Sequence, residues 1–363
     1  MKRILFVVDD LGRGGAEKIT AELANTFAEL GHSVTLAVLN ASKNTQNISS
    51  KLKYIDLNID PKFAFGKFWK TKQLSTAEKS RVDELINHQT YDLIILGFHN
   101  GYYLGQYLTQ THNVWYWVHG ELLEYRPSPH IFKRLKENIR QIRNRIKFKK
   151  LFKDRNLITV NEDLKIKYQS LLPSSQITHI PNGVPTSILE TTHTFQKEWD
   201  VIFVGRLASI KQIDHAITAF AESGLEGKMA IVGEGSKKED LIELTRQLQI
   251  INRVDFLGWA DCPNEYIQKS KVLILTSHYE AFGLVLAESL CLGTPVIAYA
   301  CSQGVKDIFA YQENMQPFLI TANHCDQLAA QLYRCATEPY PISEQTKKKL
   351  SIQHTAEKFL ALI

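Results

Sequence analysis

Two glutamates eight residues apart are the most informative feature of this chain. Glu280 follows an apolar run at residues 272–275, and Glu288 lies about two helical turns further on. The backbone amides between them open a predicted helix at Phe282, Gly283, Leu284 and Val285. The N-terminus of a helix carries free amides that favour an anion. Two carboxylates that bracket such an anion site predict binding of a sugar linked to phosphate.

Two cations follow another predicted strand, at residues 201–204. Gly205 and Arg206 come directly after this strand, and Lys211 follows five residues later. Arginine offers forked donors and lysine a point charge, so the pair can neutralise a diphosphate, although a solvated surface pair is the alternative. Because Glu280 also follows a strand, we expect it to lie opposite these cations.

Three further loops carry residues that suit ligand binding. Gly14 and Gly15 stand between the first strand and first helix, where paired glycines let a ligand approach the backbone. Their spacing fits neither a P-loop nor a dinucleotide fingerprint, and a tight turn is the alternative. His119 ends a strand and suits a sugar or phosphate contact. Gly233 and Gly235 end another strand and suit a base or ribose, again with a plain turn as the alternative.

The positive charge of the chain is concentrated in one segment. Residues 131–155 hold eleven basic and two acidic side chains, a balance of +9 against a net charge of +5, so the rest carries −4. Spacings of three and four predict an amphipathic helix whose apolar stripe is Phe132, Leu135, Ile139, Ile142 and Ile146. The cationic face includes Lys133, Arg134, Arg140, Arg143 and Lys147.

Such a cationic helix suits an anionic membrane surface or a pyrophosphate-bearing acceptor, with a solvated basic face as the alternative. Residues 62–70 mix aromatic side chains with lysines in the same way. Nucleic acid is not expected, because no recognisable binding module accompanies the charge.

The composition indicates an ordinary globular protein of two domains. The chain has 363 residues, of which 44% are hydrophobic and 22% charged. The N-terminal apolar stretch spans five residues, which predicts a buried strand and not a signal peptide. Five scattered cysteines favour reduced thiols, a cytoplasmic location and no zinc site. No D-x-D triplet occurs that would hold a metal ion for a donor diphosphate, so no metal is expected.

Both halves of the sequence alternate short apolar runs with helical patterns. In the first half we predict strands at 4–8, 33–39, 93–97 and 114–118, and a helix at 17–30. In the second half we predict strands at 201–204, 229–232, 254–257, 272–275 and 296–298, with helices at 212–221 and 237–248. Such runs are typical of parallel strands buried on both faces. We expect an α/β fold of two doubly wound, Rossmann-like domains, with a ligand crevice beyond the carboxyl ends of the strands.

The chain resembles the retaining GT-B glycosyltransferases of family four, which include phosphatidylinositol mannosyltransferases and many lipopolysaccharide and capsule enzymes. Motifs that carry the resemblance occur in the family's order along nearly the whole chain. They are Gly14-Gly15-Ala16-Glu17, His119-Gly120, Pro181-Asn182-Gly183-Val184, Phe203-Val204-Gly205-Arg206-Leu207 with Lys211, Val232-Gly233-Glu234-Gly235, Phe256-Leu257-Gly258 and the Glu280 and Glu288 pair. One departure is Gln212, where the family commonly has glycine.

The resemblance implies a metal-independent transferase that retains the anomeric configuration. It implies a UDP-sugar donor and a glycan or lipid-linked acceptor, in the synthesis of bacterial lipopolysaccharide, capsule or a related polysaccharide. The implied catalytic residues are Arg206 and Lys211 at the leaving diphosphate, and Glu280 and His119 at the donor sugar. Glu288 would bind the ribose. The other implied donor-binding residues are Gly14, Gly15, Gly205, Gly233, Gly235, Phe282, Gly283, Leu284 and Val285.

The resemblance also divides the chain by role. Residues 1–184 would bind the acceptor, residues 185–345 the nucleotide-sugar, and residues 346–363 would form a helix that returns to the first domain. The enzyme would be cytoplasmic, at the inner face of the membrane. Two alternatives stay open, namely a nucleotide-sugar epimerase of the same fold and a non-catalytic subunit of a glycan-assembly complex.

Overall fold

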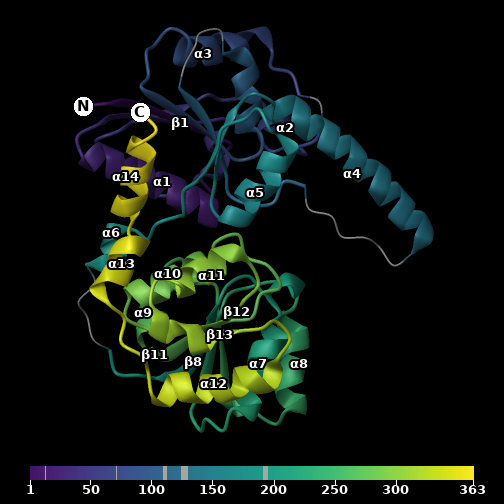
Figure 1. Ribbon diagram of the computed structural model, residues 1–363, viewed down its shortest axis with the longest axis vertical. Coiled ribbons are helices and arrows are strands. Elements are labelled where there is room, and N and C mark those ends of the chain that lie inside the picture. The colour runs from purple at the N-terminus through teal and green to yellow at the C-terminus, as the bar shows by residue number, and fades with distance from the viewer. Residues whose placement is uncertain (13, 71, 109–112, 124–129, 191–194) are drawn as a thin grey trace. The chain divides into compact units, whose positions relative to one another are not determined.

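The computed structural model consists of two compact units, and it describes residues 1–12, 14–70, 72–108, 113–123, 130–190 and 195–363 (Figure 1). Unit 1 contains Met1–Pro181 and Thr355–Ile363, and unit 2 contains Asn182–His354. The division therefore lies after residue 181, whereas we expected it after 184. The chain returns to unit 1 at residue 355, and the expected return began at 346.

Unit 1 is built on a parallel sheet of seven strands in the order β3-β2-β1-β4-β5-β6-β7. The strands are β1 (Arg3–Val8), β2 (Ser33–Val38), β3 (Lys53–Asp56), β4 (Leu93–Gly97), β5 (Val114–Val118), β6 (Asn156–Thr159) and β7 (Ile177–His179). The α-helices between them are α1 (Gly15–Glu29), α2 (Pro61–Ala64), α3 (Thr76–Ile86), α4 (Ile131–Phe152) and α5 (Glu162–Leu171). Every residue of β4 and β5 is buried, as predicted from their unbroken apolar runs.

Unit 2 is built on a parallel sheet of six strands in the order β10-β9-β8-β11-β12-β13. The strands are β8 (Trp199–Val204), β9 (Met229–Val232), β10 (Val254–Gly258), β11 (Ser270–Leu275), β12 (Val296–Tyr299) and β13 (Leu319–Ile320). The helices are α6 (Thr186–Leu189), α7 (Ile213–Glu222), α8 (Lys238–Gln247), α9 (Asn264–Gln268), α10 (Leu284–Cys291), α11 (Gln303–Phe309), α12 (Cys325–Thr337) and α13 (Glu344–Leu350). The last helix, α14 (Ile352–Leu360), begins in unit 2 and continues into unit 1. The predicted fold class, two doubly wound α/β sheets, is confirmed.

The C-terminal segment forms two helices, α13 and α14, and the expectation of one helix over 346–363 is wrong. The break falls at Ser351, which is extended and forms a parallel bridge with Val184. The Val184 amide donates to the Leu350 carbonyl at 2.7 Å, and the Ile352 amide donates to the Val184 carbonyl at 2.9 Å. These bonds attach residue 184 to unit 2, which is why the division precedes it.

The end of α14 packs in the core of unit 1. The Phe359 ring is fully buried and meets the Trp117 ring edge-on, with 4.9 Å between the ring centroids. The Thr355 hydroxyl donates to the Pro181 carbonyl at 3.0 Å, and the Asn113 amide group donates to the Leu362 carbonyl at 2.8 Å.

We predict that Phe359→Ala destabilises unit 1 by about 3–5 kcal/mol, because it leaves a cavity beside Trp117. Urea denaturation followed by tryptophan fluorescence measures the change. Leu360→Ala, at a partly exposed position of the same helix, is the matched control and should cost clearly less. Equal losses in the two variants would show that the end of α14 is not part of this core.

Candidate functional site

The loops that follow β8 and β11 bring a lysine and a glutamate of unit 2 into contact. Lys211 ends a short 3₁₀ helix at Ser209–Lys211, and its Nζ lies 2.5 Å from Oε1 of Glu280. The Ser277 hydroxyl donates to the same oxygen at 2.7 Å. The two charged side chains are only 21% and 16% exposed. Sequence reasoning placed Glu280 opposite Lys211, and the structure brings the two together.

Hydrogen bonds to the backbone tie these two loops to each other. The buried Thr276 hydroxyl donates to the carbonyls of Lys211 and Gln212, at 3.1 and 2.7 Å. The His278 amide donates to the Ile210 carbonyl at 2.8 Å. Gln212 itself has a φ of 44°, in the left-handed region that glycine adopts most easily. The backbone conformation thus accounts for the glycine that the resemblance leads one to expect here.

Arg206 is exposed, and no hydrogen-bond or ion-pair partner is found for it in the described part of the chain. Its loop is held by the neighbours of the arginine. The Gly205 amide donates to the Val232 carbonyl at 3.0 Å, and the amide of the buried Leu207 donates to the backbone carbonyl of Glu234 at 2.9 Å. The cation is therefore presented on a loop whose backbone is fastened on both sides.

Close backbone approach explains the glycines after β9. Gly233 has a φ of 146°, and a Cβ there would lie 2.0 Å from the Gly205 carbonyl oxygen. A Cβ at Gly235 would lie 2.2 Å from the Leu207 carbonyl oxygen. These glycines let the loops after β8 and β9 pack directly on each other. Their predicted contact with the donor stays a prediction.

The helix between the two glutamates begins at the expected place. Its first residue is Leu284, and the preceding Gly283 has a φ of 91° and provides no side-chain cap. No side chain caps the amides of Leu284 and Val285, whereas those of Leu286 and Ala287 already donate to the Gly283 carbonyl. Glu288 lies within α10 and is only 8% exposed, so it lies deeper than Glu280. Sequence reasoning missed Gly304, where a Cβ would lie 2.3 Å from the Ala281 carbonyl oxygen, so α11 packs tightly on this loop.

In unit 1, His119 follows β5 and lies between two aromatic rings. It stacks on Phe98 at 5.6 Å and lies 4.2 Å from Trp117, measured between ring centroids. Both of its ring nitrogens are buried, and neither has a hydrogen-bond partner among the described residues. Burial, with a smaller contribution from His99, lowers the pKa of His119 to about 3. A neutral imidazole offers one donor and one acceptor, which suits a sugar hydroxyl better than a phosphate.

A buried carboxylate positions the loop that carries Phe98. Asp9, directly after β1, accepts hydrogen bonds from the amides of Asn100 at 2.8 Å and Gly101 at 2.6 Å. Phe98 has a φ of 58°, which is uncommon for a residue with a side chain. Sequence reasoning did not single out Asp9. It did not foresee that this loop supports the ring beside His119.

The paired glycines of unit 1 lie at the start of α1. Gly14 is the residue before the helix and Gly15 its first residue, which is exposed. A Cβ at Gly14 would lie 1.9 Å from the Glu17 carboxylate, so that side chain folds back over the first turn. The predicted approach of a ligand to this backbone is thus compatible with the exposed Gly15.

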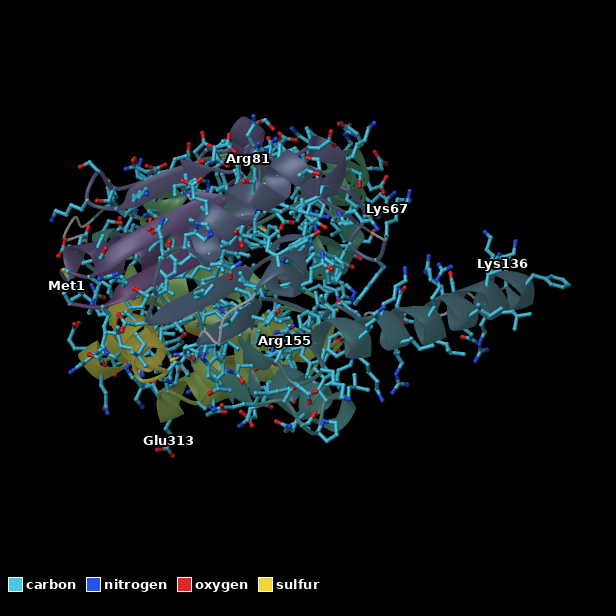
Figure 2. All side chains as sticks on the ribbon, turned by 90° about the horizontal axis from the view of Figure 1, so that it is seen from above. Met1, Lys67, Arg81, Lys136, Arg155 and Glu313 are labelled. Atoms are coloured by element: carbon cyan, nitrogen blue, oxygen red, sulfur yellow. The ribbon has the colours of Figure 1, made fainter. Side chains whose placement is uncertain are left out.

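The long helix α4 exposes its apolar stripe. Figure 2 shows α4 extending from the rest of unit 1, with Lys136 toward its far end and Arg155 near the body. The exposed fractions along the stripe are Phe132 82%, Leu135 59%, Ile139 58%, Ile142 61% and Ile146 63%. Lys133, Arg134, Arg140 and Arg143 are exposed as expected. Lys147 is not, because its ammonium donates to the Trp69 carbonyl.

A groove of about 590 Å³ lies beside α4 in unit 1. Its wall combines apolar, amide and cationic side chains from α4, α5 and the chain after β5, including Leu123, Ile142, Arg145 and Lys167. Lys167 also pairs with Glu121, close to the end of β5.

Several other features of the described residues bear on the chemistry. All five cysteines are free thiols. No cluster of three or more histidine, cysteine, aspartate or glutamate side chains that could hold a metal ion is found there. Among the helices described, none is both long and apolar enough to cross a membrane.

Solved structures of similar architecture define the fold. Sucrose-phosphate synthase from Thermosynechococcus elongatus aligns over 100% of this chain and 98% of its own, with a TM-score of 0.73 and 18% identity. Anabaena HepE, solved with UDP-glucose, aligns over 99% of both chains with a TM-score of 0.68 and 16% identity. The fold is the two-domain GT-B fold.

Sequence relatives then define the family. Residues 187–351 match the model for glycosyl transferases group 1, and residues 13–188 match that for glycosyltransferase family 4. An uncharacterised glycosyltransferase of Haemophilus influenzae is 26% identical over 90% of this chain and 88% of its own. The lipopolysaccharide 1,6-galactosyltransferase of Escherichia coli is 32% identical over 30% of this chain and 32% of its own. The chain belongs to the family-four glycosyltransferases, as the sequence motifs indicated.

We predict a pH-dependent stability difference between the protein and Asp9→Asn. Burial raises the pKa of Asp9 to about 7, and the hydrogen bonds from the amides of Asn100 and Gly101 lower it in part. The folded protein therefore keeps this proton up to about pH 7, whereas the unfolded chain releases it near pH 4. Stability from this group is lost as the pH rises through that window, and the asparagine variant cannot lose it.

The free energy of unfolding of the variant, relative to the original protein, should rise by about 2–4 kcal/mol between pH 4.5 and 8. Urea denaturation at several pH values measures it. A difference that stays constant with pH would contradict the assignment to Asp9.

Proposed function

We propose that this chain is a retaining, metal-independent glycosyltransferase that moves a sugar from a UDP-sugar to a glycan or lipid-linked acceptor of a bacterial surface polysaccharide, such as lipopolysaccharide or capsule. The observation that carries the proposal is the contact of Lys211 with Glu280 beyond the strand ends of unit 2, with the exposed Arg206 on the loop that leads from β8 to Lys211. In this proposal the acceptor oxygen bonds to the anomeric carbon, the bond to the diphosphate breaks, and the hydroxyl proton passes to the departing phosphate.

Stabilisation of the leaving group is the main physical demand of this reaction. Negative charge develops on the diphosphate as the sugar carbon becomes oxocarbenium-like, and cations held in place beforehand lower the barrier most. Arg206 would supply a forked donor and Lys211 a point charge, which is the role that a metal ion has in other enzymes. The uncapped first turn of α10 would add backbone amides to the phosphate.

The remaining site residues complete the donor site in this proposal. Glu280 accepts a hydrogen bond from a sugar hydroxyl, and Glu288 accepts from the ribose. His119, whose lowered pKa keeps it neutral, exchanges a hydrogen bond with another sugar hydroxyl. Relatives support the donor and the pathway, because HepE has been solved with UDP-glucose and the Escherichia coli relative is a lipopolysaccharide galactosyltransferase.

We predict that Arg206→Ala weakens binding of UDP about 10- to 100-fold while the protein stays folded, because it removes a charged hydrogen bond from an exposed side chain. Thermal stabilisation by UDP, GDP and ADP, followed by titration calorimetry with the best of them, measures the affinity. Arg246→Ala on α8, also exposed, is the matched control and should bind normally.

Two outcomes would contradict the proposed function. Unchanged UDP binding in Arg206→Ala would remove the diphosphate from this loop. A new sugar nucleotide formed from donor alone, without acceptor, would identify an epimerase.

We further propose that α4 docks unit 1 on an anionic membrane surface from the cytoplasmic side. An exposed apolar stripe flanked by cations has the composition of an interfacial helix. Pairing of two copies along this stripe would bring their basic faces together, which disfavours a second chain as its partner. Lys147 joins α4 to the segment 62–70 by donating to the Trp69 carbonyl. The groove beside α4 is open to a lipid-linked acceptor at the same surface.

We predict that Ile139→Ser with Ile142→Ser lowers binding to phosphatidylglycerol vesicles at least tenfold, because two apolar side chains no longer enter the interface. Vesicle cosedimentation at low and high salt measures binding. The matched control is Ile166→Ser on α5, which is 62% exposed but lies off the stripe. Unchanged binding after charge reversal at Arg140 and Arg143 would leave the patch as a solvated face.

A further inference from the structure

The carboxylate of Glu280 is held so that its two oxygens have different surroundings. Oε1 accepts hydrogen bonds from Ser277 Oγ at 2.7 Å and from Lys211 Nζ at 2.5 Å. For Oε2, no hydrogen-bond or ion-pair partner is found within the described ranges. Without those donors a carboxylate can rotate and present either oxygen, so the two contacts remove this freedom.

The two donors differ in what else they can do. Ser277 is fully buried and lies two residues after the end of β11, so its hydroxyl has no access to a ligand in solvent. Lys211 comes from a different loop, is partly exposed, and is the cation that the proposed function assigns to the diphosphate. An ammonium group has three donors, and a diphosphate beside it would compete with Glu280 for them.

We infer that Ser277 is a positioning residue that reserves Oε2 of Glu280 for a hydroxyl of the donor sugar, and that it holds this carboxylate when Lys211 turns to the diphosphate. The inference rests on the proposed function and extends it to a residue that touches no ligand. In the ligand-free protein Lys211 neutralises Glu280. When a nucleotide-sugar binds, Lys211 is shared with the phosphates, and Ser277 keeps the carboxylate in its orientation.

Thr276 and His278 restrict the proposed change of partner to the side chain of Lys211. Their hydrogen bonds to the carbonyls of Ile210, Lys211 and Gln212 fasten the backbone on both sides of Ser277. Only the end of the lysine side chain has to move, because the two loops are already joined. Ser277 therefore acts on the sugar half of the donor and not on the nucleotide half.

The test compares the affinities of Ser277→Ala for UDP and for UDP-sugars. Titration calorimetry uses UDP, UDP-glucose, UDP-galactose and UDP-N-acetylglucosamine, and the tightest UDP-sugar of the original protein is used throughout. The variant should bind that sugar nucleotide about tenfold more weakly and bind UDP as before. Ser270→Ala is the matched control, since that serine is equally buried, lies at the other end of β11 and donates to the Tyr266 carbonyl at 2.8 Å.

A double-variant cycle separates positioning from a general loss of packing. If Ser277 acts through Glu280, then Ser277→Ala should have no further effect on sugar-nucleotide affinity in a Glu280→Ala background. An equal effect in both backgrounds overturns the inference, as does equal weakening of UDP and UDP-sugar. If the original protein binds neither UDP nor any of the three UDP-sugars, the proposed donor fails and the inference with it.

Discussion

The contact between Lys211 and Glu280 is the interaction on which the unit 2 site depends. Both side chains are about four-fifths covered, and each charge would be costly to hold there alone. A nucleotide-sugar presents an anionic diphosphate next to a neutral ring with hydroxyl groups, so its site needs a cation and a hydrogen-bond acceptor side by side. The contact between Lys211 and Glu280 that would serve a bound donor also neutralises both charges when no donor is bound. Thr276 and His278 hold the two loops together, and this preorganisation lowers the cost of reaching the reactive arrangement.

In unit 1 a buried carboxyl group holds the loop beside the candidate site residue His119. Asp9 binds the amides of Asn100 and Gly101, and the loop that they hold places Phe98 against the His119 ring. The strained backbone of Phe98 is tolerated because these bonds determine the path of the chain. In both units the candidate binding and catalytic side chains lie just beyond the ends of the strands. Their positions are set by hydrogen bonds that continue past the sheets.

Sequence reasoning succeeded where burial determines the pattern. The strands β4, β5 and β9 were predicted with their observed bounds, because continuous apolar runs mark strands covered on both faces. It missed β3, which is mostly exposed at an edge, the short strands β6 and β7, and β13, which has two residues. The proximity of Lys211 and Glu280 followed from their strand-end positions. The parts played by Ser277, Asp9 and Phe98 did not, because they depend on hydrogen bonds and a backbone angle that residue types do not reveal.

In the helix α4, an amphipathic pattern does not lead to burial of the apolar face. The same spacing that buries one face of an ordinary helix here leaves five large apolar side chains exposed, from Phe132 to Ile146. Such a stripe is unfavourable in water unless another surface covers it, and the charge of +9 on residues 131–155 is the ground for the proposed anionic partner. The last turns of α4 are held against unit 1, since Phe148 and Phe152 are buried and Lys147 donates to the Trp69 carbonyl. In the proposed docking, the buried last turns anchor α4 to unit 1 and the exposed stripe enters the lipid. A lipid surface does not require the exact shape complementarity that a protein partner does.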